Sequence, residues 1–205
     1  MKYKYKNLST EKLYNNGDFD FKSDIVETFI KNHNEIYESL IKNSKKINKA
    51  SNILQDTYLN GGRIFFIGAG TSGRLGVIEA AEMPPTFGVR SGKFIGLIAG
   101  GKKALTFAAE GAEDQGELAI NELEKHCFNK KDLLVGISAS GTSEYVLSAL
   151  IKAKKMKSKN ILLTCNKPKV KISDFDIVLR VGPEILAGST TVSYTHLTLP
   201  TNREV

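Results

Sequence analysis

Short apolar runs that alternate with helical segments constrain the fold of this chain more than any other feature. Glycines follow the first two of them closely. Segments typical of strands are RIFFIG (63–68), FIGLIAGG with its glycine turn (94–101), DLLVGISAS (132–140), NILLTC (160–165) and DIVLRVG (176–182). Strands that alternate with helices predict an α/β fold, with a parallel five-stranded sheet and flanking helices on both faces.

Amphipathic segments lie between and before these strands. Residues 21–59 carry apolar side chains at helical spacing up to Asn60-Gly61-Gly62, so we expect residues 1–60 to form a helical N-terminal arm. A helix is expected after the first strand, and Pro84-Pro85 should end it. Further helices are expected over 104–114, 117–127 and 143–156.

Two loops rich in glycine and hydroxyl groups follow the first and third expected strands, at 68–74 and 138–143. Ligands bind at the carboxyl ends of strands in open α/β sheets. Glycines let a backbone approach an anion, a helix N-terminus favours negative charge, and hydroxyls donate to phosphate oxygens. We therefore expect a phosphomonoester to bind at Gly70, Thr71, Ser72, Gly73, Ser138, Ser140, Gly141 and Thr142.

The first loop has the spacing G-x-G-x-x-G, which is common in dinucleotide-binding folds. Such a site needs a carboxylate at the end of the second strand to hold the ribose, and here residues 97–102 read LIAGGK. The Walker pattern Gly-Lys-Ser/Thr does not follow the loop either. One alternative remains open: both loops are tight turns whose Ser and Thr residues cap helices.

Composition excludes several classes of protein. The formal net charge is +7, and its excess lies largely in IKAKKMKSKN, which is typical of a solvated helix C-terminus and lacks the aromatic or Arg residues of a nucleic-acid site. No apolar run approaches 18 residues, and the N-terminus does not resemble a signal peptide. Cys127 and Cys165 are expected to be buried thiols in a reducing compartment, without a metal.

Six blocks follow one another along the chain: GAGTSGRLGVIEAAEMPPTFG, GLIAGGKKAL, EGAEDQGE, VGISASGTSEYVLSAL, LLTCN and VGPEILAGST. In this order they resemble the N-acetylmuramic acid 6-phosphate etherases, enzymes built on a sugar isomerase (SIS) domain. The resemblance extends from the N-terminal arm to about Thr190. It implies a SIS sugar-phosphate domain over residues 61–190.

The resemblance also implies an activity and its residues. The family cleaves the lactyl ether of N-acetylmuramic acid 6-phosphate to N-acetylglucosamine 6-phosphate and D-lactate, in cytoplasmic recycling of cell-wall sugar. It acts as a homodimer without a metal or organic cofactor. Glu82 and Glu113 match positions with acid/base roles. By themselves they would be a solvated helix-end carboxylate and a helix N-terminal acid, and Glu79 would be a surface partner for a lysine.

Two departures from the family pattern stand out. The second loop usually continues Ser-Gly-Arg-Thr-Pro-Tyr, whereas here residues 140–145 read SGTSEY, with Glu144 in place of the proline. The family also continues with further helices after the position of Thr190. Residues 191–205, TVSYTHLTLPTNREV, lack helical periodicity, so we expect a non-native tail on a shortened reading frame, and a chain that is inactive and aggregates by itself.

Other functions on the same domain remain open. A regulatory protein that binds a sugar phosphate without catalysis needs the hydroxyl loops but neither glutamate. A sugar-phosphate isomerase shares proton removal at C2. A transcriptional regulator would carry a basic helix-turn-helix before the sheet. Residues 1–60 are nearly balanced in charge and lack the pattern of short helices joined by a turn.

Overall fold

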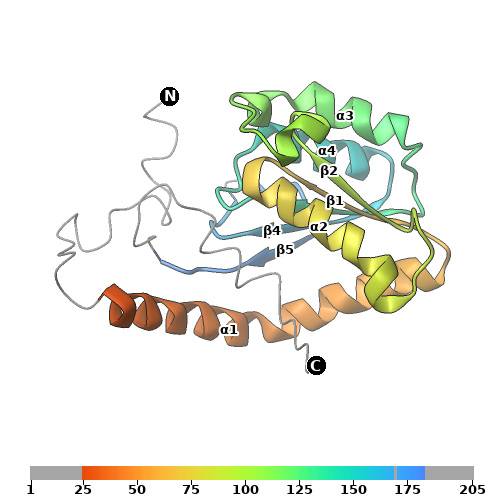
Figure 1. Cartoon of the computed structure of the whole chain (residues 1–205). Coiled ribbons are helices and arrows are strands. Elements are labelled where there is room, and N and C mark those ends of the chain that lie inside the picture. Colours follow the sequence, from red (N-terminus) through yellow and green to blue (C-terminus); the bar gives the residue numbers. More distant parts are fainter. Residues whose placement is uncertain (1–24, 169, 183–205) are drawn as a thin grey trace.

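The computed structural model describes residues 25–168 and 170–182, as four α-helices, two 3-10 helices and five strands (Figure 1). The expectations for residues 1–24 and for the tail 191–205 lie outside the described residues. In chain order the elements are α1 (Ile25–Leu59), β1 (Ile64–Gly68), α2 (Gly70–Phe87), β2 (Phe94–Ile98), η3 (Gly101–Leu105), η4 (Ala112–Asp114), α3 (Gly116–Lys125), β3 (Leu133–Ile137), α4 (Glu144–Lys155), β4 (Lys159–Thr164) and β5 (Phe175–Val178).

The five strands form one parallel sheet in the order β2-β1-β3-β4-β5. This confirms the predicted α/β fold with a parallel five-stranded sheet. The chain leaves β1 toward β2 on one side and returns to β3 on the other side. The order of the strands therefore reverses between β1 and β3, and open α/β sheets bind ligands at the carboxyl edge of such a switch point.

Helices cover both faces of the sheet, α1 and α2 on one face and α3 and α4 on the other (Figure 1). The strands supply both cores because successive side chains point to opposite faces. In β1, Ile64 and Phe66 face α1 and α2, while Phe65 and Ile67 face α3 and α4. This explains why the first strand is apolar without alternation.

Glycines let α2 approach the sheet closely. A Cβ on Gly96 of β2 would lie 2.4 Å from the Cα of Val77, and one on Gly76 would lie 2.9 Å from the Cβ of Phe66. The helix therefore packs directly on the backbones of β1 and β2 and runs from their carboxyl ends toward their amino ends. This orientation decides which residues of α2 lie near the glycine loops. None of the described helices is both long and apolar enough to cross a membrane.

The prediction that Pro84-Pro85 ends the second helix is wrong. α2 continues to Phe87, and Gly88 ends it with φ of 64° and an N–H that donates to Pro84 O at 2.9 Å. A proline removes one helical hydrogen bond, but its φ near −65° is itself helical. Near a C-terminus the loss is small, and a left-handed glycine completes the turn.

The helix expected over 104–114 is also absent from the structure, where only η3 and η4 contain helical residues in this segment. The physical reason is packing against the end of β2. A Cβ on Gly100 would lie 2.7 Å from that of Ala109 and 3.2 Å from that of Ala104. The small side chains of these two alanines therefore pack closely against the backbone of Gly100. Gly111, with φ of 72°, then turns the chain into η4.

The two cysteines differ. Cys165 is buried, as predicted, but Cys127 is exposed. Cys127 lies in the turn that follows α3, with a positive φ of 48°, and its carbonyl accepts a hydrogen bond from the Nη2 of Arg63 at 2.8 Å. The apolar residues around it in sequence are buried by the helix and the next strand, whereas the turn that joins them faces solvent.

Candidate functional site

The second loop gathers three hydroxyl groups at the carboxyl end of β3. Gly141, with φ of 68°, donates its N–H to the Oγ of Ser138 at 3.1 Å. The Oγ of Ser140 accepts from the N–H of Thr142 at 3.2 Å and from its Oγ1 at 2.9 Å. The Oγ atoms of Ser138 and Ser140 lie 3.5 Å apart. The loop is thus a compact turn with its hydroxyls side by side.

The end of β4 supports this loop from below. Asn166 donates its Nδ2 to Ala139 O at 2.9 Å, and the Oγ1 of Thr164 donates to the same carbonyl at 3.2 Å. Both side chains are buried. These contacts fix the backbone of the second loop without using the hydroxyls of Ser138, Ser140 or Thr142.

The first loop begins at Gly68 and leads directly into α2. Ala69 precedes the helix and no side chain caps it. The first N–H groups of a helix have no partner within it, so those of Gly70 and Thr71 face the end of the sheet. Ser72 is buried, at 7% exposure, and none of the hydrogen bonds between described residues uses its hydroxyl. A Cβ on Gly73 would lie 2.6 Å from Gly68 O, so only glycine allows this tight turn.

No Ser or Thr side chain caps α2 or α4, although the hydroxyls of Ser138 and Ser140 accept backbone N–H groups within the tight turn of the second loop, as the alternative expected. Ser143 precedes α4 and makes no side-chain cap, just as α2 has none. Its Oγ instead donates to the backbone carbonyl of Glu113 at 3.3 Å. The N-termini of α2 and α4 are therefore free of side-chain caps at the place where the two loops meet.

The structure brings the two loops and Glu113 to one place. Gly68 at the end of β1 pairs with Ile137 at the end of β3, so both loops start side by side at the switch point of the sheet. Glu113 is half-buried in η4, and the hydrogen bond from Ser143 ties its backbone to the second loop. Of the two predicted acidic residues, this one has its backbone next to the second loop.

The other predicted carboxylate, Glu82, does not join them within this chain. It is exposed and lies ten residues after Ser72 in α2. At 1.5 Å of rise per residue the two Cα atoms are ~15 Å apart along the helix axis. Since α2 runs from the carboxyl ends toward the amino ends of β1 and β2, Glu82 lies toward the amino edge of the sheet.

The environment of Glu79 differs from the one expected from the sequence. We expected it to pair with a lysine, but it is half-buried, and its charged neighbour is Glu82, one turn further along α2. Burial raises the pKa of Glu79 above its ordinary value, and the negative charge of Glu82 raises this pKa further. The sequence does contain a signal for this contact: Glu79 and Glu82 are three residues apart, and residues at that spacing are neighbours on a helix.

The raised pKa predicts a pH-dependent stability. Above the ordinary value of 4.5 the folded state binds more protons at Glu79 than the unfolded state, so stability falls as pH rises through the folded-state pKa. Glu79→Gln removes this cost. We expect a higher melting temperature for the variant at pH ~7 and no gain at pH ~3.5, where both states are protonated.

Thermal melts monitored by circular dichroism at both pH values test this. The matched control is Glu110→Gln, which removes an exposed carboxylate from the same protein. An equal gain for both variants at neutral pH would show that only the net charge of the protein matters.

Glu144, the departure in the second loop, is the first residue of α4 and is exposed. Proline fits this first helical position because it has no N–H to satisfy. A carboxylate fits it for another reason, since it interacts favourably with the positive end of the helix dipole. The local fold therefore tolerates either residue, but here a negative charge stands next to the expected anion site.

Groups of three or more His, Cys, Asp and Glu side chains that would suit a metal ion do not occur among the described residues.

The lysine-rich stretch is the C-terminal end of α4, with Lys154 and Lys155 exposed, as expected for a solvated helix end. Lys152 in the same turn forms an ion pair with Glu124 at 2.6 Å. The candidate site is a cradle made of the hydroxyls of Ser72, Ser138, Ser140 and Thr142 and the uncapped N-termini of α2 and α4, with the backbone of Glu113 next to it.

Comparison with solved structures supports the fold. The chain aligns with a phosphoheptose isomerase, GmhA, from Neisseria gonorrhoeae with a TM-score of 0.63 and 17% identity, over 87% of this chain and 93% of that one. It aligns with the sugar isomerase domain of an RpiR transcription factor from Sphaerobacter thermophilus with a TM-score of 0.51 and 15% identity, over 84% and 86% of the chains. Identities this low show a common fold and nothing more.

Related sequences identify the family more specifically than the solved structures do. The chain is 52% identical over 133 residues to N-acetylmuramic acid 6-phosphate etherase of Staphylococcus epidermidis, covering 64% of this chain and 45% of the relative. It is 42% identical over 194 residues to the enzyme of that name in Clostridium botulinum, covering 90% of this chain and 64% of the relative. The chain thus spans about half to two thirds of the length of these relatives.

A family model, the glucokinase regulatory protein N-terminal SIS domain, matches residues 45–154. This range begins within α1 and ends within α4, so it includes both hydroxyl loops and Glu113. The match covers more than half of the chain. The chain therefore belongs to this SIS-domain family, and the resemblance of its sequence to the N-acetylmuramic acid 6-phosphate etherases is confirmed.

Proposed function

We propose that this protein is a carbon–oxygen lyase that cleaves N-acetylmuramic acid 6-phosphate to N-acetylglucosamine 6-phosphate and D-lactate. The observation that carries the proposal is the hydroxyl cradle at the β1/β3 switch point with Glu113 tied to it, in a chain similar to enzymes of that name. The proposal includes an arm over residues 1–60, a sugar-phosphate domain over 61–190, and a place in cytoplasmic recycling of cell-wall sugar.

The phosphate would bind to the free N–H groups at the start of α2 and to the hydroxyls of Ser72, Ser138, Ser140 and Thr142. The Oγ of Ser140 accepts two hydrogen bonds from Thr142, so its own proton can point to the Oγ of Ser138, 3.5 Å away, or to a phosphate oxygen when one is bound. Charge-assisted bonds of this kind are stronger than bonds between neutral groups. The cradle therefore fixes one end of the substrate and leaves the sugar to reach the carboxylates.

The reaction needs proton transfer at two atoms of the open-chain aldehyde. A base removes the C2 proton, which the C1 carbonyl acidifies, while an acid protonates the C3 ether oxygen, and lactate leaves. Water then adds to C3 of the unsaturated aldehyde, and a proton returns to C2, so that one water is consumed overall. Glu82 and Glu113 would perform these transfers, and such groups contribute ~10²–10⁴-fold each.

The proposal includes a homodimer, which the separation of these two carboxylates within one chain supports. Glu113 adjoins the loops, whereas Glu82 lies ~15 Å along α2 from Ser72. If a second copy of the chain docks on the outer face of α2, the Glu82 of each subunit approaches the loops of the other. One complete site then contains carboxylates from two subunits.

The outer face of α2 suits such a contact because it carries apolar side chains around Glu82. Ile78 is 51% exposed, and Pro85 is exposed one turn beyond Glu82. Arg74, on the same face, donates its Nη2 to Phe107 O at 3.2 Å, which holds the 73% exposed Phe107 next to this stripe. Exposed apolar patches rimmed by polar groups are typical of protein interfaces.

Lactate release tests the proposed reaction. The substrate is N-acetylmuramic acid 6-phosphate, and the protein is tested as the chain itself and as an extended chain, in which residues 1–190 continue into the C-terminal part of the Clostridium botulinum relative. We expect equimolar D-lactate and N-acetylglucosamine 6-phosphate from the extended chain. An extended chain that is folded and binds the substrate without releasing lactate would exclude the lyase.

A regulatory sugar-phosphate-binding protein is the second candidate. It is favoured by the distance of Glu82 from the loops within one chain, because binding alone needs only the hydroxyl cradle. The two functions differ in the glutamates: a binding protein keeps its full activity as a ligand sensor when both are replaced by glutamine. A sugar-phosphate isomerase would instead convert an aldose phosphate without releasing lactate.

A further inference from the structure

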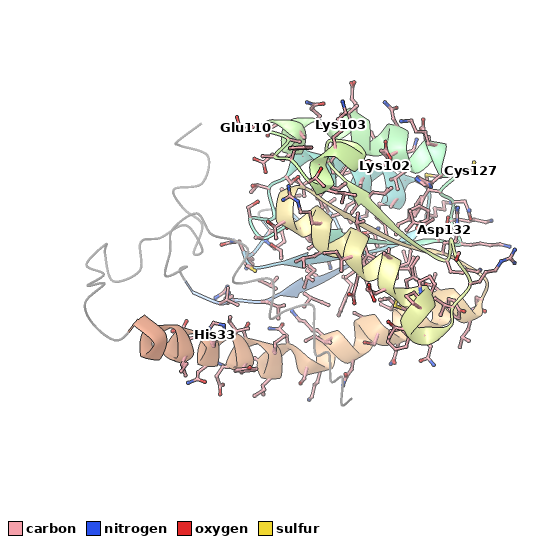
Figure 2. The ribbon with its side chains drawn as sticks, viewed as in Figure 1. His33, Lys102, Lys103, Glu110, Cys127 and Asp132 are labelled. Carbon is pink, nitrogen blue, oxygen red and sulfur yellow. The ribbon has the colours of Figure 1, made fainter. Side chains whose placement is uncertain are left out.

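A second cluster of charged residues lies at the amino edge of the sheet, opposite the hydroxyl loops. Arg63, Lys93 and Asp132 each stand directly before a strand, β1, β2 and β3 respectively. Ile64 pairs in register with Phe94 and Leu133, so the three residues before them lie in one row. Figure 2 shows Asp132 at this end of the sheet and Glu110 toward the other end.

Arg63 and Asp132 form one side of this cluster, and hydrogen bonds hold both side chains in place. Asp132 is 3% exposed and accepts hydrogen bonds from the Nε of Arg63 at 3.1 Å and from its Nη2 at 2.7 Å. The guanidinium also donates its Nη1 to His126 O at 2.9 Å. Asn129 donates to Asp132 through its backbone N–H at 2.9 Å and its Nδ2 at 3.0 Å. The charge of Asp132 is therefore fully engaged with its neighbours.

A cavity of about 320 Å³ lies beside Arg63 and Asp132. Asp132 is the single carboxylate among the residues that line it, which are Gly61, Arg63, Arg90, Ser91, Gly92, Lys93, Asn129, Lys131 and Asp132. With Arg63 neutralised by Asp132, three cations remain. Lys93 donates its Nζ to Gly61 O at 2.8 Å, but the side chains of Arg90 and Lys131 make no hydrogen bond or ion pair with any described residue.

We propose that this cavity is a second anion site, which binds a small molecule with two or more negative charges through Arg90, Lys93 and Lys131. Three cations around a concave surface raise the local concentration of anions. The lining contains no aromatic side chain on which a base would stack, which disfavours nucleic acid. The five residues of β1 separate this site from the hydroxyl loops by ~17 Å, so one small ligand does not occupy both.

Titration calorimetry with pyrophosphate at low ionic strength tests the site. The hydroxyl loops also attract phosphates, so the experiment uses the full chain with Ser72→Ala and Ser140→Ala as its background. We expect one pyrophosphate site to remain there, and the further pair Arg90→Gln and Lys131→Gln to weaken it about tenfold or more, because each loses a hydrogen bond to a charged group. Citrate as a second titrant distinguishes a general polyanion site from one that needs phosphate.

Two controls make the result decisive. Lys154→Gln and Lys155→Gln remove the same charge from the exposed end of α4 and should leave pyrophosphate binding unchanged. Arg90→Lys with Lys131→Arg keeps the charges and should retain binding, which separates loss of charge from loss of fold. The proposal is overturned if the background protein binds no pyrophosphate, or if both glutamine pairs weaken binding equally.

Discussion

We expect replacement of Glu82 or Glu113 by glutamine to lower the rate of lactate release by ~10²–10⁴-fold in the extended chain, with little change in affinity for the sugar phosphate. The amide keeps the size of the side chain but neither accepts nor donates the proton. Stopped assays for D-lactate give the rate, and calorimetry with the substrate gives the affinity. Near-normal turnover in both variants would exclude the proposed acid/base roles.

Mixing the two variants tests where the carboxylates come from. If each site combines Glu82 of one subunit with Glu113 of the other, a mixed dimer contains one intact site and one with both replacements. Random exchange of subunits then restores about a quarter of the normal activity, because half of the dimers are mixed. If both carboxylates come from one subunit, every site in the mixture lacks one of them, and activity stays at the level of the separate variants.

We expect Ser72→Ala and Ser140→Ala each to weaken binding of the sugar phosphate. A hydrogen bond to a charged group is worth ~1.5–3 kcal/mol, or roughly 10- to 150-fold in Kd. Ser72 is buried at the start of α2, and no hydrogen bond between described residues uses its hydroxyl. The Oγ of Ser140 accepts two bonds from Thr142, so its proton can turn from Ser138 to a phosphate oxygen. Calorimetry with N-acetylglucosamine 6-phosphate, the proposed product, measures both effects without turnover.

Ser51→Ala is the matched control for these variants, because Ser51 is exposed on α1. It should bind the product like the parent. Unchanged affinity for the product in both loop variants would show that these hydroxyls do not bind the phosphate. The assignments of fold and family do not depend on this result. Weaker binding in all three variants would indicate a general loss of stability, which thermal melts detect.

Local patterns in the sequence were sufficient for most of the sheet. All five predicted strands are present, because short apolar runs between glycines have few other ways to bury themselves. The two hydroxyl loops were also predictable, since the residue types themselves supply the donors. Their meeting at a switch point followed from the strand order, which places Gly68 and Ile137 side by side.

Local patterns failed where packing overrides intrinsic preference. Alanine-rich residues 104–114 favour a helix by propensity, yet contact with Gly100 holds most of them in another conformation. The Pro84-Pro85 pair was expected to stop α2, but a proline near a helix C-terminus loses few bonds, and Gly88 ends the helix instead. Cys127 was taken as buried from its apolar neighbours, although it lies in an exposed turn.

By itself, the sequence determined the fold class, the family and the chemical types of the candidate site, because these depend on periodicity and on motifs that are contiguous in the chain. Only the tertiary structure decided which residues share a place. The register of three strands builds the charged row of Arg63, Lys93 and Asp132. The direction of α2 keeps Glu82 away from Ser72 while the fold ties Glu113 to the second loop, since the distance between residues depends on how helices pack on the sheet and not on their separation in sequence.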